Sequence, residues 1–255
     1  MSRIRFIGTG TSTGVPEIGC QCHTCTSSDL RDQRFRSSAL IEYGDEVILL
    51  DCGPDVRLQL LQARTERLDR ILLTHEHYDH TGGIDDIRPL FWKAPFCPIH
   101  AEPNVLEALH RRMPYAFGEH RYPGLPQLVT MPVFPLEPID TRSGAEILPF
   151  RVMHGKLPIV GYKFGNLAWV TDCKTLPQES IELLKGIPHL VVNALRLYEH
   201  PAHMSFDETM QLLQEIQPQQ AYLIHFAHTI GRHVEVEALC PQGVQPAYDG
   251  LTFDF

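Results

Sequence analysis

Four potential metal ligands lie within six residues of this chain. They are His75, His77, Asp79 and His80, in the pattern H-x-H-x-D-H, directly after the apolar run 71–73. Burying so many titratable groups without partners would cost several kcal/mol for each group, so core packing does not explain them. Imidazole and carboxylate are common ligands of zinc and related metals. The pattern therefore predicts two metal ions, one on His75 and His77 and the other on Asp79 and His80.

Three further ligand candidates each follow an apolar run later in the chain. His154, Asp172 and His225 come after the runs 150–153, 167–170 and 221–224. A carboxylate offers two oxygens, so Asp172 is the best bridge between two metals about 3.5–4 Å apart. Asp51 also ends a run, at 47–50, and either orients a ligand from behind or forms a turn before Gly53.

A second candidate metal site lies near the N-terminus. Cys20, Cys22 and Cys25 form the pattern C-x-C-x-x-C, which in a reduced compartment more often holds a metal than a disulfide. Structural zinc takes four ligands, and three sulfurs leave one position open. The fourth ligand is expected from one of three nearby histidines: His23, His228 or His233. We predict one structural zinc in an insertion around residues 19–26.

The elements that must position these residues alternate between strands and helices. Short apolar runs bounded by turn residues are typical of strands buried on both faces. Helical patterns cover 55–67, 104–113 and 178–185, and Ser205 with Glu208 forms a predicted capping box for a further helix. The Pro-rich stretch 114–138 predicts loops, and Arg88, Trp92, His120 and Arg121 are interpreted as solvated surface. The alternation favours a layered α/β fold, with residues 1–255 as a single domain.

Composition limits the possible partners. The chain has 255 residues, 43% hydrophobic content and a net charge of −9, without a run of Lys or Arg. Genomic DNA is therefore a poor candidate partner, although a metal pair would still attract small anions. The sequence enters the segment 3–7 without an apolar leader and has no stretch of about eighteen apolar residues. We expect a cytoplasmic protein with no membrane partner.

The ligand order resembles a known superfamily. H-x-H-x-D-H followed by a single His, Asp and His resembles the metallo-β-lactamase superfamily of dinuclear hydrolases. The opening 8–11, the cysteine cluster and the segment 202–206 are similar to the PhnP-type phosphodiesterases of the carbon–phosphorus lyase pathway. Those enzymes hydrolyse a cyclic phosphodiester of ribose, carry an extra structural zinc and often form dimers. The resemblance implies a four-layer αββα sandwich, with two mixed sheets inside and helices outside.

The resemblance also assigns roles to individual residues. It implies one metal on His75, His77 and His154, and a second on Asp79, His80 and His225, with Asp172 as the bridge. It implies that Cys20, Cys22, Cys25 and His228 bind the structural zinc. It implies that His203 stands near the scissile bond, and we count Asp79 with His203 as catalytic. Manganese and zinc both occur in the dinuclear site of such enzymes.

A mechanism follows from the expected metal pair. A water shared by two divalent cations loses its proton near neutral pH, and the resulting hydroxide attacks phosphorus in line. The leaving alkoxide then needs a proton. His203 lies in a predicted loop, two residues before Ser205, and an imidazole with a pKa of about 6.5 suits a general acid. An exposed loop histidine without a role is the alternative interpretation of His203.

Other functions on the same ligand set stay open. A redox di-iron protein is expected to show H-x-E-x-D, and His77 disfavours it. A tRNA 3′-processing endonuclease shares the ligands, but it would need a basic arm that we do not find. A lactone or thioester hydrolase also uses an activated hydroxide. A non-enzymatic protein, similar to the cofactor-biosynthesis members of this superfamily with incomplete sites, is a further alternative, which the complete ligand set disfavours. The PhnP-type resemblance, together with His203, implies a small phosphodiester as substrate.

Overall fold

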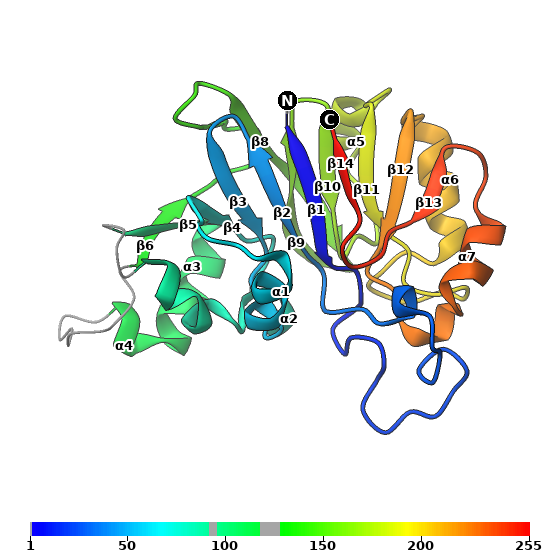
Figure 1. The fold of residues 1–255 in the computed structure, drawn as a ribbon. Coiled ribbons are helices and arrows are strands. Elements are labelled where there is room, and N and C mark those ends of the chain that lie inside the picture. The colour runs from blue at the N-terminus through cyan, green and yellow to red at the C-terminus, as the bar shows by residue number, and fades with distance from the viewer. Residues whose placement is uncertain (1, 92–95, 118–127) are drawn as a thin grey trace.

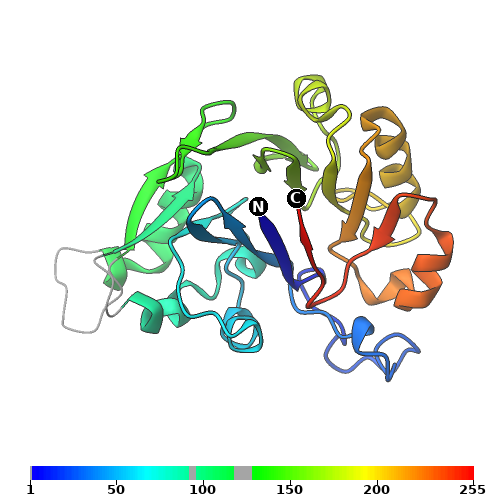
Figure 2. The same cartoon turned by 45° about the horizontal axis from the view of Figure 1, so that its top comes forward.

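Two seven-stranded sheets face each other at the centre of the molecule, and helices cover their outer faces (Figure 1). The computed structural model describes residues 2–91, 96–117 and 128–255. The layers follow the order helix, sheet, sheet, helix, and Figure 2 shows both sheets from a second direction. The predicted four-layer αββα sandwich with two mixed sheets is confirmed.

The first sheet is antiparallel from β14 to β3 and parallel from β3 to β6. In spatial order its strands are β14 (Thr252–Asp254), β1 (Arg3–Gly8), β2 (Ser38–Tyr43), β3 (Glu46–Leu50), β4 (Arg70–Leu72), β5 (Cys97–Ala101) and β6 (Leu128–Pro132). Parallel neighbours need crossover connections. These contain α1 (Val56–Ala63), α2 (Tyr78–Thr81), η2 (Ile84–Phe91), α3 (Pro103–Arg112) and α4 (Pro114–Phe117).

The second sheet repeats this arrangement. Its strands are β13 (Val244–Pro246), β12 (Gln220–Ile224), β11 (His189–Asn193), β10 (Leu167–Val170), β9 (Leu157–Phe164), β8 (Glu146–His154) and β7 (Ile139–Asp140). They are antiparallel from β7 to β10 and parallel from β10 to β13. The connections of the parallel part contain α5 (Gln178–Leu184), α6 (Phe206–Ile216), η3 (His228–Ile230) and α7 (His233–Leu239). A short helix η1 (Leu30–Asp32) follows the cysteine-rich segment.

The main apolar core lies between the two sheets. Phe6 from β1, Tyr162 from β9 and Trp169 from β10 are fully buried there. The hydroxyl of Tyr162 donates to the carbonyl of Leu73 at 2.8 Å, which satisfies a buried polar group and joins the second sheet to the end of β4. This contact fixes the backbone just before the histidine-rich segment.

Several predicted elements are present, with changed ends. The capping box of α6 is formed, because the Ser205 amide donates to Glu208 Oε2 at 2.8 Å. Helix α1 ends at Ala63, before the predicted end at 67, because Arg64 has a left-handed backbone with φ of 53°. The stretch 114–138 was predicted as loops, but it contains α4 and the edge strand β6. A strand that pairs on one side only needs no continuous apolar run, so its pattern is weak.

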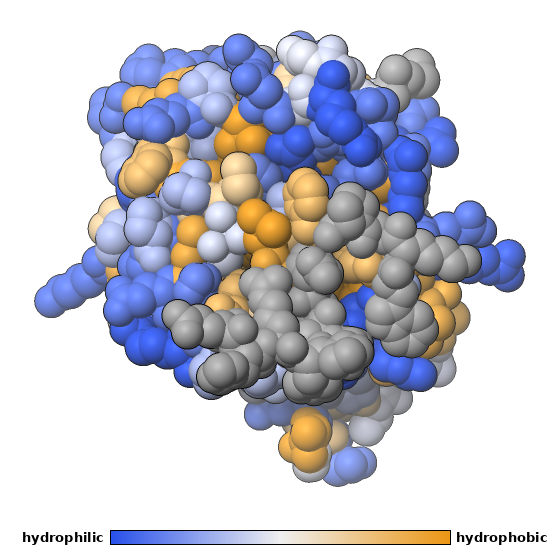
Figure 3. All heavy atoms as spheres, turned by 90° about the vertical axis from the view of Figure 1, so that its left-hand side faces the viewer, coloured by the Kyte–Doolittle hydropathy of each residue, from blue (hydrophilic) through white to orange (hydrophobic). Residues whose placement is uncertain are grey.

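The face beside β6 carries several exposed apolar side chains. Figure 3 shows this side of the molecule, with apolar patches between polar ones. Val129 and Met131 on β6 and Phe134 just after it are each about 40% exposed (39%, 42% and 44%). Among the described residues, no helix combines the length and the apolar character needed to span a bilayer.

Candidate dinuclear metal centre

The predicted ligands come together at one edge of the sandwich. His154 is the last residue of β8, Asp172 follows β10 by two residues and His225 directly follows β12. From the first sheet, the segment 75–80 follows β4 and includes the short helix α2. Parallel strands present their carboxyl ends at the same edge, so residues far apart in sequence meet there.

One group of three histidines lies on the solvent side of this edge. Ligand nitrogens of His75, His77 and His154 are all within 4.8 Å of one another. Nε2 of His75 is 3.0 Å from Nδ1 of His77. His75 and His154 are buried and His77 is exposed, so the group is open to solvent at His77. These are the residues predicted to hold the first metal.

The second group combines carboxylates with histidines. Ligand atoms of Asp79, Asp172 and His225 lie within 4.8 Å of one another. Nε2 of His80 is 3.1 Å from Asp79 Oδ2 and 3.2 Å from Asp172 Oδ2. Asp172 also places Oδ1 3.2 Å from Nε2 of His225. It thus faces several ligand candidates at once, as a bridging carboxylate must, and its bridging role stays a prediction.

The second nitrogen of four of these histidines already has a partner, and for His75 it is Thr74 Oγ1, at 2.9 Å from Nδ1. Nδ1 of His80 is 2.7 Å from Asp51 Oδ2, Nδ1 of His154 is 2.8 Å from the carbonyl of Ala202, and Nδ1 of His225 is 3.1 Å from Ser37 Oγ. Such contacts fix the tautomer and aim the other nitrogen at the site. Asp51 therefore orients His80, the first of the two roles open for it.

Asp51 is itself held firmly behind the site. Its Oδ1 accepts a hydrogen bond from the amide of Thr74 at 2.8 Å, and the Thr74 hydroxyl donates to both carboxylate oxygens. Asp51 is fully buried. Ser37 and Ala202 were not singled out from the sequence, because a serine hydroxyl and a backbone carbonyl carry no distinctive pattern.

Three of the strand-end residues have an unusual backbone. Asp51, Asp172 and His225 have φ values of 56°, 53° and 60°, in the left-handed region that non-glycine residues seldom adopt. Such conformations cost about 1–3 kcal/mol each and concentrate at functional sites. Gly53 allows another close approach, because a Cβ there would lie 2.0 Å from the carbonyl oxygen of Asp79.

The charges of the centre depend strongly on one another. Burial alone would lower the pKa of His80, but Asp51, Asp172 and Asp79 raise it well above its usual value. Burial would raise the pKa of Asp172, but His225 and His80 lower it well below its usual range. The centre therefore gathers carboxylate charge that attracts positive charge, from protons or from metal ions.

One buried atom provides a test of whether a metal fits. Nε2 of His80 is buried and has no hydrogen-bond partner among the described residues, although two carboxylates lie close to it. The raised pKa of His80 means that its ring is protonated in the metal-free chain, so Nε2 carries a proton toward the carboxylates of Asp79 and Asp172 that a metal ion would displace. A cation between these atoms would satisfy all three, and the donor set of imidazoles and carboxylates suits zinc or manganese.

His203 adjoins the centre from the loop before α6. Its Nδ1 is 3.6 Å from Asp172 Oδ1, and its ring centroid is 4.5 Å from that of His154. Burial and the nearby His225 lower the pKa of His203 to about 3. The ring is therefore neutral at pH 7 in the ligand-free chain. The charge of Asp172 acts in the opposite direction and raises this pKa.

The cysteine cluster forms a separate site at the first residue of η3, His228. Sγ of Cys20 and Cys22 are 3.4 and 3.3 Å from Nδ1 of His228, and Cys25 belongs to the same group of possible ligands. His23 instead contacts Glu235 at 3.3 Å, and His233 contacts Arg34 at 3.2 Å. Of the three candidates for the fourth zinc ligand, His228 is the one beside the sulfurs.

The thiols of Cys22 and Cys25 differ in pKa. The hydrogen bond with His228 is the main cause that lowers the pKa of Cys22 to about 6, whereas burial raises the pKa of Cys25 to about 12. Glu17 Oε2 lies 3.0 Å from Nε2 of His228, so the other ring nitrogen, Nδ1, faces the sulfurs. This geometry fits a tetrahedral zinc, whose positive charge would deprotonate the remaining thiols.

The histidine and aspartate geometry can be compared with known proteins. Residues 46–226 match the family described as the beta-lactamase superfamily domain. The chain belongs to this superfamily. A diphosphatase of the PhnP family, known from its crystal structure, matches with a TM-score of 0.93 and 34% identity, over 100% of this chain and 97% of that one. The predicted resemblance to metallo-β-lactamase hydrolases and to PhnP-type proteins is confirmed.

Curated members of the superfamily have different names. The chain is 42% identical over 251 residues to an octanoyltransferase of Porphyromonas gingivalis, a match that covers 98% of this chain and 51% of that protein. It is 35% identical over 160 residues to a ribonuclease Z of a Bradyrhizobium species, covering 61% of this chain and 48% of that protein. The chain thus spans about half the length of the curated relatives it matches.

Membership of the superfamily supports divalent metal binding in general. Proteins of this fold typically bind such metals, and the clusters described above could hold them. The number of ions, their identity and the assignment of each ligand remain predictions. Arg88 pairs with Asp85 at 2.7 Å on the surface, while Trp92, His120 and Arg121 lie outside the described residues.

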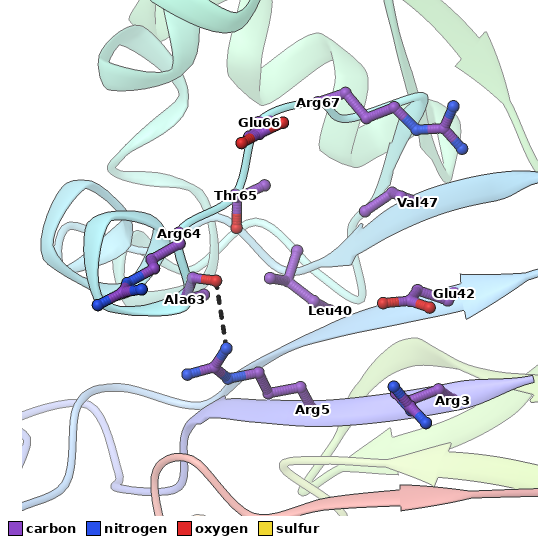
Figure 4. A pocket seen from close by; sticks show the side chains of 10 residues that line it. All are labelled: Arg3, Arg5, Leu40, Glu42, Val47, Ala63, Arg64, Thr65, Glu66 and Arg67. Atoms are coloured by element: carbon purple, nitrogen blue, oxygen red, sulfur yellow. Dashed lines mark hydrogen bonds between the residues drawn. The ribbon is translucent and has the colours of Figure 1, made fainter.

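A cavity of about 530 Å³ lies away from the predicted metal ligands. It is lined by several arginines near the end of α1 (Figure 4). Arg5 donates to the carbonyl of Ala63 at 3.2 Å and so satisfies a free carbonyl at the helix end. Arg3 pairs with Asp254 at 2.7 Å. Arg3 and Arg5 thus already have structural partners.

Proposed function

We propose that this chain is a metal-dependent phosphodiesterase that cleaves a small phosphodiester. The observation that carries the proposal is the position of His203, with Nδ1 3.6 Å from Asp172 Oδ1 at the centre of the predicted ligand cluster. A proton carrier beside a predicted metal pair suits a reaction whose leaving alkoxide must be protonated. From the PhnP-type resemblance we propose a cyclic ribosyl phosphodiester of phosphonate metabolism as substrate and a cytoplasmic homodimer as the working form.

The chain's own residues would divide the work. His75, His77 and His154 would hold one ion, Asp79, His80 and His225 the other, and Asp172 would bridge them. When bound, two divalent cations lower the pKa of a shared water and offset negative charge on the phosphoryl group. His203 would place a proton at the leaving oxygen, on the side of Asp172 and His154. Asp51 would keep His80 in the tautomer that binds through Nε2.

Two other activities have support from the relatives. Ribonuclease Z relatives favour an RNA phosphodiester, although the chain has a net charge of −9 and no run of Lys or Arg. The octanoyltransferase relative favours an acyl ester or thioester. That name describes a protein twice as long as the match, so it does not say which half transfers the octanoyl group. A small phosphodiester remains the better proposal, because the PhnP-family diphosphatase matches over both whole chains.

The test is hydrolysis of bis(p-nitrophenyl) phosphate by protein loaded with manganese or zinc. Asp172→Ala should lower kcat/KM at least about 100-fold, because even residues behind the ligands commonly contribute 10–100-fold. His203→Ala should lower it less with this substrate, since p-nitrophenolate leaves without a proton. With a 2′,3′-cyclic nucleotide the His203→Ala loss should reach roughly 100-fold or more, because the leaving alkoxide needs one.

Parallel substrates separate the alternatives. A diphosphate diester, a tRNA precursor with a 3′ trailer and p-nitrophenyl octanoate are offered to the same preparations. Hydrolysis of the octanoate alone, with no phosphodiester turnover under either metal, would overturn the proposal in favour of acyl chemistry. If His203→Ala lowers kcat/KM equally for bis(p-nitrophenyl) phosphate and for the 2′,3′-cyclic nucleotide, His203 is not the general acid. The phosphodiesterase proposal would still hold.

A further inference from the structure

A short loop carries His203 and a second histidine to the mouth of the centre. It covers residues 196–203, between β11 and α6, and is called the 196–203 loop below. Its two ends are tied together, because the amide of Leu195 donates to the carbonyl of Met204 at 3.0 Å and the amide of Phe206 donates to the carbonyl of Arg196 at 2.9 Å. The loop is therefore a closed unit whose internal contacts decide where its side chains point.

Arg196 makes several contacts within this loop, which also carries the acidic residue Glu199. Its Cζ lies 4.0 Å from the centroid of the Tyr198 ring, a cation–π contact. Its Nη2 donates to the carbonyl of Glu199 at 2.6 Å, and its Nε donates to the carbonyl of Tyr198 at 3.2 Å. No carboxylate pairs with Arg196 in the part of the chain that the structure describes. Its charge is available to an anion.

His200 lies on this loop with one nitrogen free. Its Nδ1 accepts a hydrogen bond from the amide of Ala202 at 3.2 Å, so the neutral ring carries its proton on Nε2. Across residues 2–91, 96–117 and 128–255, nothing accepts that proton. The ring centroid of His200 is 5.0 Å from that of His203. The carbonyl of Ala202 accepts from His154, so Ala202 contacts His200 through its amide and a predicted metal ligand through its carbonyl.

The surroundings of His200 are positively charged. Burial is the main cause that lowers its pKa, and the charges of Arg196, His154 and Lys174 lower it further. Lys174 is paired with Glu208, so Arg196 supplies the unpaired charge. A neutral donor in a positive environment suits an anionic acceptor, because hydrogen bonds to charged oxygens are the stronger ones.

We propose that His200 is a substrate-binding residue that donates its Nε2–H to an anionic phosphoryl oxygen of the substrate, beside His203. The Arg196–Tyr198 contact holds the loop that presents this donor. The inference rests on the proposed function, since it names an additional contact to the same phosphoryl group. It assigns His200 to binding and leaves proton transfer to His203.

Two substitutions at position 200 separate the two nitrogens of the ring. In His200→Asn the amide sits near the place of Nδ1, so it can still accept from Ala202 but offers nothing at Nε2. In His200→Gln the amide reaches toward the place of Nε2 and can donate there. Both variants and the wild type are loaded with the same metal, and affinity for inorganic phosphate is measured by calorimetry. KM and kcat for bis(p-nitrophenyl) phosphate are measured alongside.

We expect phosphate affinity to fall only in the variant that lacks a donor at the place of Nε2. His200→Asn should weaken phosphate binding and raise KM by roughly 10–100-fold, the usual effect of a lost hydrogen bond to a charged group, with a smaller change in kcat. His200→Gln should recover most of that loss. Leu197→Ala, an exposed position on the same loop, controls for general changes in the loop and should alter phosphate affinity less than about twofold.

Other outcomes overturn one proposal or the other. If His200→Asn binds phosphate as tightly as the wild type, or if Asn and Gln weaken it equally, His200 is no phosphoryl donor. Either result counts only with unchanged metal content and melting temperature, and it leaves the phosphodiesterase proposal intact if the wild type is active. A wild type that binds phosphate but hydrolyses no phosphodiester would contradict the proposed function instead.

Discussion

Single residues behind the predicted ligands decide which nitrogen each histidine offers. Asp51 contacts His80 and Thr74 and is fully buried, so its carboxylate acts on the site only through these neighbours. Its effect is electrostatic as well as geometric, because it raises the pKa of His80 together with Asp172 and Asp79. A change at this position should therefore alter metal affinity more than it alters the fold.

Asp51→Asn should lower the affinity for the second metal about 10–100-fold. The amide removes the negative charge that supports His80, and partners behind a ligand typically have effects of this size. The measurement is competition with a chromophoric chelator. Asp45→Asn is the matched control, since Asp45 is exposed and lies just before β3, at the end of that strand opposite Asp51. Equal affinities for both variants would show that Asp51 only shapes a turn.

The sequence shows the candidate ligands more clearly than it shows their supports. His154, Asp172 and His225 stand out because each follows an apolar run, and polar residues at strand ends are easy to recognise. Ser37 and the carbonyl of Ala202 have no such signal, because they reach the site through chain folding rather than through a motif. The left-handed backbone at Asp172 is equally invisible without the structure.

At the scale of elements, η3 connects the two predicted metal sites. His225 directly follows β12 and His228 begins η3, three residues later, so the cysteine cluster and the predicted dinuclear centre share one short segment. Cys22 and His228 are 206 residues apart in sequence but in contact. A zinc ion there would close this very long loop and hold the segment 225–228 against the Cys-rich insertion.

Cys22→Ser should remove the structural zinc and loosen the shared segment. Losing one of four ligands usually abolishes tetrahedral zinc binding, and the segment 225–230 then loses its anchor. We expect zinc content to fall by one ion per chain and amide hydrogen exchange at 225–230 to rise about tenfold or more, or ~1.4 kcal/mol in local stability. Elemental analysis and exchange mass spectrometry measure the two effects.

Cys240→Ser is the matched control for this prediction. Cys240 is a partly buried cysteine whose Sγ donates to the carbonyl of Val236, and it is not part of the described cluster. Its replacement should leave zinc content unchanged. Unchanged exchange at 225–230 in zinc-free Cys22→Ser would mean that the two sites are mechanically independent.

Element prediction worked best where strands are buried on both faces. The runs 47–50 and 167–170 coincide with β3 and β10, which lie inside their sheets. β6 and β7 lie at sheet edges, pair on one side and lack continuous apolar runs, so they were missed. The internal strands β2, β5, β9 and β11 were also not predicted, and in β9 Pro158 and Gly161 interrupt the pattern.

At the scale of the whole molecule, buried charge links stability to pH. Asp249 is partly buried, and it accepts hydrogen bonds from the Thr9 hydroxyl at 2.7 Å and from the amide of Phe35 at 2.6 Å. Burial raises the pKa of Asp249 to about 7 in the folded chain. A folded pKa above the unfolded value gives stability that is complete below the unfolded pKa and lost as pH rises toward the folded one.

Asp249→Asn should therefore flatten the pH dependence of stability. The wild type should lose on the order of a few kcal/mol between about pH 4 and pH 7, where the unfolded chain ionises and the folded carboxyl keeps its proton. The variant lacks this titration. Urea unfolding of both proteins, at fixed metal concentration, gives the difference between them at each pH. Parallel curves for the two proteins would contradict a raised pKa.

The two chain ends lie side by side at the end of the sandwich opposite the predicted ligands (Figure 1). β1 pairs with β14 through Arg3 and Asp254, whereas the other end of β1 leads to Thr11, which contacts His225. A fusion partner attached at either end would leave the centre open. Joining the two ends by a short linker should also permit circular permutation.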